Sequence, residues 1–198
     1  MQVLFGAADR DLLQCYRLLL TDAERTVETA FDGAQVLTKL ASQRFDLLIL
    51  ERGIPRVGSD RIVAKCVRDG LPVIELLPGP LTTQELLAPT PANAYLSHPF
   101  LPAELEELID SVLQKTAGAE VLQFEGFAVY PAEFSLETLP VTAGELDVLS
   151  ALHAGQAVRG ERQSVFIRAL NARMTRLGLR YRIRYQKNTG YRMVTEDE

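Results

Sequence analysis

The chain has 198 residues, a length that suits one large domain or two small ones. Its hydrophobic residues (47%) and charged residues (24%) are in the proportions of a soluble globular protein, and no apolar run reaches the ~18 residues that a transmembrane helix needs. Residues 1–6 lack the basic segment that opens a signal peptide. We therefore expect a cytoplasmic protein with no membrane contact.

The net charge of −5 conceals two blocks of opposite sign. Residues 1–158 hold 11 basic and 22 acidic side chains, a net charge of −11, whereas residues 159–192 hold 10 basic side chains and one acidic, a net charge of +9. A basic block of this density is a candidate surface for binding a polyanion. Its separation from the acidic block indicates two functions in one chain.

Residues 1–115 alternate short apolar runs with amphipathic segments. The apolar runs predict β-strands at residues 3–6, 26–30, 47–50, 73–76 and 94–97. The segments between and after them predict helices at residues 9–21, 32–40, 59–69, 82–87 and 102–113. Ser59 is expected to cap the third of these helices and Gly70 to end it. Regular alternation predicts an α/β fold, a doubly wound five-stranded parallel sheet with helices on both faces.

A sheet of this kind has its functional site at the carboxyl ends of its strands. Those ends carry Ala7 and Ala8 after the first strand and Glu51 after the third. Leu77 follows the fourth strand and His98 the fifth. These positions are therefore the candidate site of the first domain.

The two cysteines, Cys15 and Cys66, fall on apolar faces of predicted helices and lie far apart in the sequence. We expect buried free thiols in preference to a disulfide or a redox pair.

Residues 116–119 are small or polar and predict a linker to a second domain at residues 120–198. Short β-like runs follow at residues 121–124, 127–130 and 134–136. Thr142 and Glu145 have the spacing of a capping box that opens a helix. A longer helix is expected at 164–177, and the alternating run 181–185 before Gly190 predicts a closing β-hairpin. The second domain is thus expected to be a small α+β fold.

Several runs in residues 1–115 resemble bacterial response-regulator receiver domains. The run 45–55 is similar to the strand that carries the phosphate-accepting aspartate, and Phe31-Asp32-Gly33 follows the second strand as in that family. The run 94–100 is similar to the family's A-x-x-Y-L-T-K-P-F signature. The runs occur in the family's order and at its intervals, so the resemblance implies the flavodoxin-like fold of a phosphorylation switch.

The residues that perform the receiver's chemistry are replaced. A working receiver needs two adjacent acids that hold Mg²⁺, an aspartate acceptor, a hydroxyl and a lysine. The aligned residues here are Ala7, Ala8, Glu51, Leu77 and His98. Mg²⁺ prefers carboxylate and water oxygens, which alanines do not supply, and the side chain of neighbouring Asp9 is expected to point elsewhere. We expect a pseudo-receiver that is not phosphorylated and holds neither metal nor cofactor.

Glu51 has two interpretations. One is a permanent mimic of a phosphoryl group, strengthened by an ion pair with protonated His98. The other is a solvated side chain at a strand end with no signalling role. Tyr95 matches the family's switching aromatic residue, and Leu77 in place of a hydroxyl favours a single rotamer for it. We expect a receiver fixed in one state that serves as a dimerisation or docking module.

Residues 120–194 resemble the winged-helix DNA-binding domain of OmpR/PhoB-type response regulators. The run 139–146 is similar to the family's V-x-L-T-x-x-E-[apolar], the run 166–174 to its recognition helix and the run 187–192 to its wing. Arginine and asparagine read base edges in the major groove, and cations on the wing contact phosphates. On the helix these residues lie off the apolar stripe. The expected DNA contacts are Arg168, Asn171, Arg173, Arg176, Arg180, Arg182, Arg184, Lys187 and Arg192.

One departure concerns the helix-turn-helix, because Thr142 and Ile167 are only 25 residues apart, well short of the family's usual spacing. The second helix, which supports the recognition helix, is largely missing, as is the loop that in the family often touches RNA polymerase. The recognition helix is therefore expected either to sit at an unusual angle or to belong to a domain that binds protein.

Taken together, these features predict a phosphorylation-independent transcriptional regulator of the two-component type. We expect it to bind double-stranded DNA, to form a homodimer through the receiver and to contact RNA polymerase. The alternative is an adaptor whose basic domain binds an acidic protein partner. We do not expect an enzyme, because the sequence has two histidines, no metal-ligand cluster and no nucleophile motif.

Overall fold

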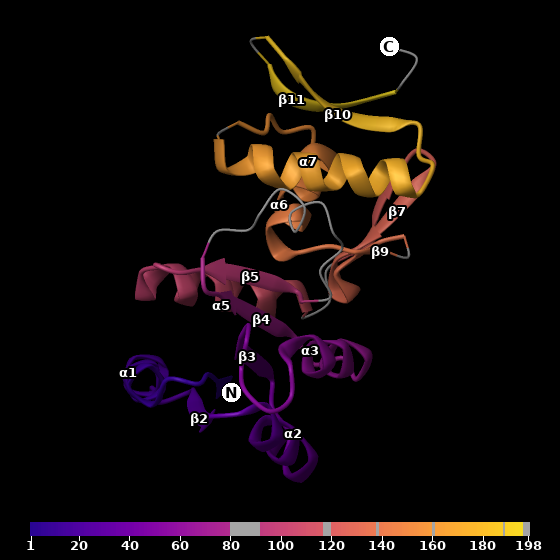
Figure 1. The fold of residues 1–198 in the computed structure, drawn as a ribbon. Coiled ribbons are helices and arrows are strands. Elements are labelled where there is room, and N and C mark those ends of the chain that lie inside the picture. Colours follow the sequence, from indigo (N-terminus) through magenta and orange to yellow (C-terminus); the bar gives the residue numbers. More distant parts are fainter. Residues whose placement is uncertain (80–91, 117–119, 138, 160, 188, 196–198) are drawn as a thin grey trace. The chain divides into compact units, whose positions relative to one another are not determined.

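The computed structural model describes residues 1–79, 92–116, 120–137, 139–159, 161–187 and 189–195 (Figure 1). These residues form two compact units, the first made of residues 1–79 and 92–113 and the second of the described residues from 114 onward. The helix predicted at residues 82–87 lies outside the described residues. Of the helices that the structure describes, none has the length and apolar character that crossing a membrane requires.

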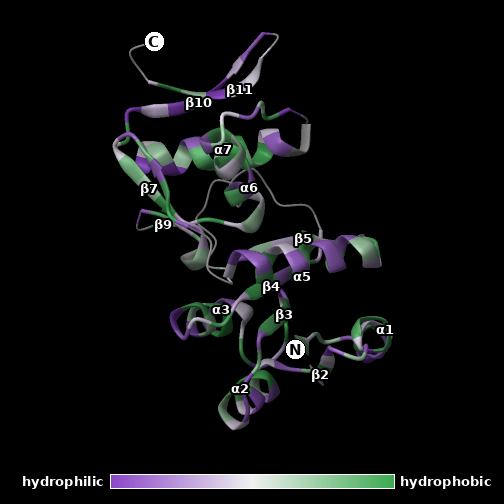
Figure 2. Cartoon of the chain, turned by 180° about the vertical axis from the view of Figure 1, so that it is seen from behind, coloured by the Kyte–Doolittle hydropathy of each residue, from purple (hydrophilic) through white to green (hydrophobic). Residues whose placement is uncertain are grey.

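The first unit is built on a five-stranded parallel sheet, as the sequence predicted, and the structure gives its strand order as β2-β1-β3-β4-β5. The central strand β3 is an almost fully buried apolar run, typical of a strand covered on both faces, and it is coloured as hydrophobic in Figure 2. The strands are β1 (Gln2–Gly6), β2 (Thr26–Ala30), β3 (Leu47–Glu51), β4 (Val73–Leu77) and β5 (Ala94–Ser97).

Helices cover both faces of this sheet. Leu4 packs in an apolar cluster with Ile62 of α3 and with residues of α2. Phe5, the next residue along β1, points to the opposite face and meets the ring of Tyr16 on α1, with ring centroids 5.5 Å apart. The helices are α1 (Arg10–Leu20), α2 (Gly33–Ser42), α3 (Ser59–Arg68) and α5 (Pro102–Thr116).

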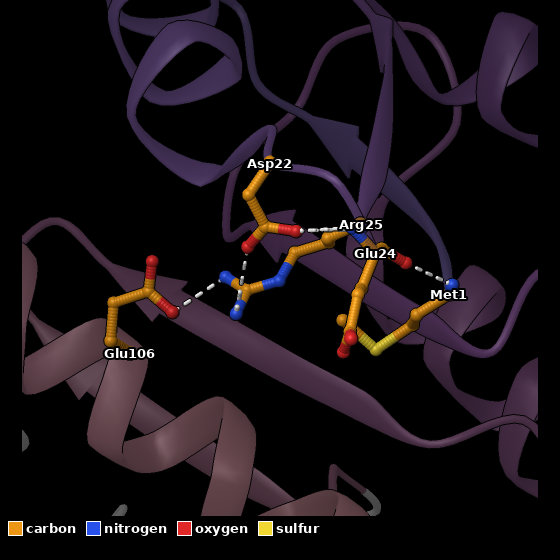
Figure 3. A network of polar contacts seen from close by, with 5 residues as sticks. All are labelled: Met1, Asp22, Glu24, Arg25 and Glu106. Carbon is orange, nitrogen blue, oxygen red and sulfur yellow. Dashed lines mark hydrogen bonds and ion pairs between the residues drawn. The ribbon is translucent and has the colours of Figure 1, made fainter.

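A polar network joins the amino terminus, the start of β2 and α5 (Figure 3). The Asp22 carboxylate accepts hydrogen bonds from the amides of Glu24 and Arg25, each 2.8 Å long, and these bonds lower the pKa of Asp22. The Arg25 guanidinium forms an ion pair with Glu106 on α5 at 2.5 Å, and the Met1 amino group donates to the carbonyl of Glu24. These contacts hold α5 against the β2 side of the first unit.

Two predictions for the helices of the first unit are wrong. Cys15 is exposed on α1, although Cys66 on α3 is buried as expected. Leucines occur on more than one side of α1, with Leu18 and Leu19 exposed, so periodicity could not decide which side packs. Ser59 is not the cap of α3, because Gly58 holds that position and no side-chain hydrogen bond caps the helix.

The second unit is an α+β fold, as predicted. Four short antiparallel strands in the order β6-β7-β8-β9 are followed by two helices and a hairpin. The capping box is confirmed, since Glu145 and Thr142 exchange hydrogen bonds between side chains and backbone amides. The elements are β6 (Leu122–Phe124), β7 (Phe127–Tyr130), the 3₁₀ turn η1 (Pro131–Glu133), β8 (Ser135–Leu136), β9 (Leu139–Pro140), α6 (Ala143–His153), α7 (Glu161–Arg176), β10 (Tyr181–Gln186) and β11 (Gly190–Thr195).

Candidate phosphoacceptor pocket and nucleic-acid interface

The carboxyl ends of the parallel strands bring the predicted pocket positions to one edge of the sheet. Ala7 and Leu77 are buried there, Ala8 is exposed, and Glu51 and His98 are half-buried. The His98 amide donates to the carbonyl of Leu77 at 2.9 Å, which ties the end of β5 to the end of β4.

Glu51 has a definite contact in this pocket. Its carboxylate accepts a hydrogen bond from the backbone N–H of Ala8 at 2.8 Å, so it bridges the end of β3 and the loop after β1. Glu51 and His98, both within the described residues, form no ion pair with each other, and the His98 ring lies instead against Phe100, with centroids 4.5 Å apart. The ion pair considered from the sequence is therefore absent, and Glu51 is not a freely solvated side chain.

The pocket does not fit the Mg²⁺ ion that receiver chemistry requires. Ala7 and Ala8 supply no side-chain oxygen, and the carboxylate of Asp9 is used to cap α1, accepting from the amides of Asp11 and Leu12. The prediction that Asp9 points elsewhere is thus confirmed. Across the described part of the chain, no three His, Cys, Asp or Glu side chains gather closely enough to hold a metal ion.

A buried acid near this edge was missed from the sequence. Glu75 lies within the apolar run of β4, is 3% exposed, and forms an ion pair with Arg52 at 2.6 Å. It stands opposite Tyr95 in the register of β4 and β5, and Tyr95 is half-buried. The signal that could have revealed Glu75 was a single acid between residues that are otherwise apolar.

The second unit carries a different feature, a set of exposed cations that have no carboxylate partner among the described residues. Arg184 and Arg192 stand directly opposite each other in the β10–β11 register, a position in which like charges repel. In the first unit Lys39 and Lys65 are ion-paired, whereas Arg17, Arg44 and Arg61 are exposed without such a partner in the described part of the chain but are spread over separate elements. The exposed cations, six of the nine predicted DNA contacts, are Arg168, Arg176, Arg180, Arg184, Lys187 and Arg192.

Arg173 corrects the sequence prediction, because it does not face solvent. It is 2% exposed, its Nη1 forms an ion pair with Glu145 on α6, and its Nε donates to the carbonyl of Pro140 at 2.8 Å. Burial raises the pKa of the Glu145 carboxyl, against the opposing effects of Arg173 and of the Thr142 hydrogen bonds. Arg173 therefore fastens α7 to α6 and cannot read a base from this position.

Asn171 and Arg182 are also used within the unit. The Asn171 side chain donates to the carbonyl of Ile183 at 2.9 Å and accepts from its N–H at 2.8 Å, as a neighbouring strand would. The Asn171 amide, expected to contact DNA, is therefore already used by the hairpin backbone. Arg182 is half-buried, and its Nη1 donates to the carbonyls of Leu179 and Tyr181 at 2.6 Å each.

The connection between α6 and α7 is short, as the sequence predicted, and the described residues 154–159 contain no helix. Val158 forms a β-bridge to Tyr191 of β11, whose N–H donates to the Val158 carbonyl at 3.0 Å. Gly190 has φ +83°, and a Cβ there would lie 2.7 Å from the same carbonyl. The connection is thus fastened to the hairpin that packs on α7.

Tyr185 is a further side chain of this surface that the sequence analysis did not select. It is 65% exposed and lies in the hairpin between Arg184 and Gln186. The alternation of Tyr185 with arginines in the predicted hairpin strand could have identified it from the sequence.

Comparison with solved structures decides the fold of the first unit. The receiver domain of Francisella response regulator 1452 superposes with a TM-score of 0.53 over 58% of this chain and 98% of that domain, at 19% identity. A signal receiver domain from Pseudomonas fluorescens gives 0.52 over 57% of this chain and 94% of that one, at 24% identity. The first unit has the receiver fold.

The likeness continues past the receiver unit in one protein. A mutant of RitR superposes with a TM-score of 0.65 over 98% of this chain and 99% of RitR, at 16% identity. At this identity the comparison shows a shared fold, a receiver unit followed by an α+β unit.

The chain also has relatives in sequence. A candidate transcriptional regulator of Haloferax volcanii is 29% identical over 171 residues, which are 85% of this chain but 29% of that protein, so the chain spans less than a third of it. The response regulator ArlR of Staphylococcus aureus is 24% identical over 157 residues, 76% of this chain and 72% of ArlR. No protein-family model matches the chain.

Proposed function

We propose that this chain is a response-regulator-type transcriptional regulator whose second domain, residues 120–198, binds double-stranded DNA. The observation that carries the proposal is the set of six exposed cations on α7 and the hairpin that have no carboxylate partner among the described residues. The names of its relatives, a candidate transcriptional regulator and a response regulator, support the same function. The non-enzymatic role expected from the sequence agrees with these relatives.

The receiver, residues 1–115 before a linker at 116–119, is proposed to act without phosphorylation. Two alanines replace the residues that would hold Mg²⁺, and Glu51 is already bonded to the amide of Ala8. Together with Leu77 at the position of the missing hydroxyl, this supports a receiver that keeps one state, with Tyr95 in one rotamer. Aspartyl-phosphate chemistry has no acceptor and no metal ligands here.

The partners follow from the same resemblance. We infer a homodimer formed through the receiver, a contact with RNA polymerase and a cytoplasmic location, as is expected of a two-component transcription factor. Sedimentation velocity of the intact chain with Glu107→Lys and Leu101→Glu as surface variants tests the dimer, since both exposed residues lie on or beside α5.

One observation favours the alternative function, an adaptor that binds an acidic protein. Asn171 and Arg173 are occupied by bonds within the second unit, so α7 presents only Arg168 and Arg176 of the four side chains expected to read bases. A surface with fewer base-reading groups is compatible with recognition of an acidic protein surface.

The test is the salt dependence of binding to duplexes selected from random DNA. Six phosphate contacts predict an affinity loss on the order of 10³-fold between about 50 and about 200 mM salt. Arg184→Gln and Arg192→Gln should each lower the slope of log K against log salt by about 0.9. Arg61→Gln, an exposed arginine on α3 of the receiver, is the matched control and should leave the slope unchanged. No retention on DNA at low salt, with capture of an acidic protein, would establish the adaptor instead.

A further inference from the structure

The hairpin carries one exposed aromatic side chain, Tyr185. It is 65% exposed. Arg184 precedes it in β10, and Lys187 follows two residues later. The ring is therefore open to a partner of this unit, close in the chain to exposed cations.

The register of the hairpin shows which way Tyr185 points. Tyr185 pairs with Tyr191 and Ile183 pairs with Met193, and residues two apart in a strand share one face. Ile183 is buried, and its backbone is bonded to Asn171 of α7. Tyr185 therefore lies on the same face of the hairpin as buried Ile183, but closer to the hairpin tip, where the face is exposed. The Arg184–Arg192 pair lies on the opposite face.

The ring of Tyr185 is also held in place. Tyr191 meets it edge to face, with ring centroids 5.4 Å apart and the planes at 70°. A tyrosine has few side-chain torsions to fix, so a ring supported from one side loses little freedom when it binds. Tyr185 is therefore an exposed side chain supported by a neighbour, on the face of the hairpin whose buried part packs on α7.

We propose that Tyr185 contacts the sugar–phosphate backbone of DNA between the segments that α7 and the hairpin tip touch. Its ring covers a deoxyribose, and its phenol O–H donates a hydrogen bond to a phosphate oxygen, a type of contact that tyrosine makes in protein–DNA complexes. The inference rests on the proposed DNA-binding function. It adds a neutral contact to a surface otherwise defined by its cations.

A neutral contact and a cationic contact differ in their salt dependence. Removing a cation changes how many counterions are released and therefore the slope of log K against log salt, whereas removing a tyrosine lowers affinity by the same factor at every salt concentration. We expect Tyr185→Ala to weaken binding about tenfold with an unchanged slope. Tyr185→Phe, which keeps the ring and loses the hydroxyl, should weaken it roughly threefold.

The experiment uses the full chain and one selected duplex, and measures affinity at four salt concentrations. Arg184→Gln provides the contrast, since its slope should fall by about 0.9. Leu18→Ala, an exposed apolar side chain of the receiver unit, is the control and should bind as wild type. Urea unfolding of Tyr185→Phe should give the wild-type midpoint, because the ring that meets Tyr191 is kept.

The outcomes separate this inference from the proposed function. If Arg184→Gln weakens binding but Tyr185→Ala binds as wild type, or alters the slope, the tyrosine contact is overturned while DNA binding stands. If Tyr185→Phe equals wild type, the phosphate hydrogen bond is overturned. If the wild-type chain does not bind duplex DNA even at low salt, both proposals are overturned.

Discussion

Polar side chains at the carboxyl edge of the receiver sheet have structural partners. Asp9 caps α1 through the amides of Asp11 and Leu12, and Glu51 accepts from the amide of Ala8. His98 lies against Phe100. Each of these groups stands at or beside one of the predicted pocket positions and is engaged in a structural contact.

The two cysteines offer a test at the same scale. Cys15 is exposed, whereas Cys66 is buried, and burial raises the pKa of its thiol to about 11. At pH 8 we expect a thiol reagent to label one cysteine per native chain and both in concentrated urea. The thiolate is the reactive form, so Cys66 is protected by its charge state as well as by packing.

Cys15→Ser is the control for this labelling. The variant should take up no label until it is unfolded. Uptake of two labels by the native wild-type chain would contradict the burial of Cys66.

At the scale of elements, α7 is held by three separate connections. Arg173 fastens it to α6 and β9, and Asn171 fastens it to β10. The short segment before α7 is joined to β11 through Val158. These connections support α7 without the additional helix whose absence the spacing of the sequence indicates.

The ion pair between α6 and α7 gives the second prediction. Removing one partner of a buried pair leaves the other charge without compensation, so Arg173→Ala should lower the free energy of unfolding by about 3–5 kcal/mol. The measurement is urea denaturation followed by circular dichroism. Thr175→Ala, on the exposed side of α7, is the control and should change stability by less than about 0.5 kcal/mol.

Replacing both Glu145 and Arg173 tests whether the loss of stability comes from the charge that is left without a partner. Glu145→Leu with Arg173→Met leaves no buried charge, so the double variant should be more stable than either single variant. If Arg173→Ala unfolds at the wild-type urea concentration, the pair does not hold the two helices together.

At the scale of the whole molecule, the chain joins an acidic receiver unit to a unit whose carboxyl-terminal part is basic. The same order of folds occurs in RitR over nearly the full length of both chains. The proposed phosphorylation independence belongs to this scale, because Ala7 and Ala8 follow β1 and Glu51 ends β3.

We therefore expect acetyl phosphate with Mg²⁺ to leave the intact protein unchanged. Mass spectrometry should detect no phosphoryl group, and affinity for DNA should be the same with and without the reagent. Glu51→Asp should behave in the same way, because it restores the acceptor but not the metal ligands at positions 7 and 8. A stable phosphoryl group on residue 51 would refute phosphorylation independence.

The sequence by itself determined most of the architecture. Alternating apolar runs and helical periodicity gave the parallel sheet and its helices, and the Thr142–Glu145 spacing gave the capping box. The sequence also showed which residues stand at the pocket positions in place of those of a working receiver. The reason is that each pocket position directly follows or ends a predicted strand. These features depend on residues that are close together in the chain, so a single segment of the sequence is enough to predict them.

The tertiary structure alone decided which side chains remain available. Arg173 and Asn171 looked exposed because periodicity assigns a helix one buried side, whereas α7 packs against both α6 and β10. Cys15 looked buried because α1 carries apolar residues on two sides and only one of them meets the sheet. Packing partners that are distant in the sequence make this choice, since burial and ion pairing depend on segments that local patterning does not record.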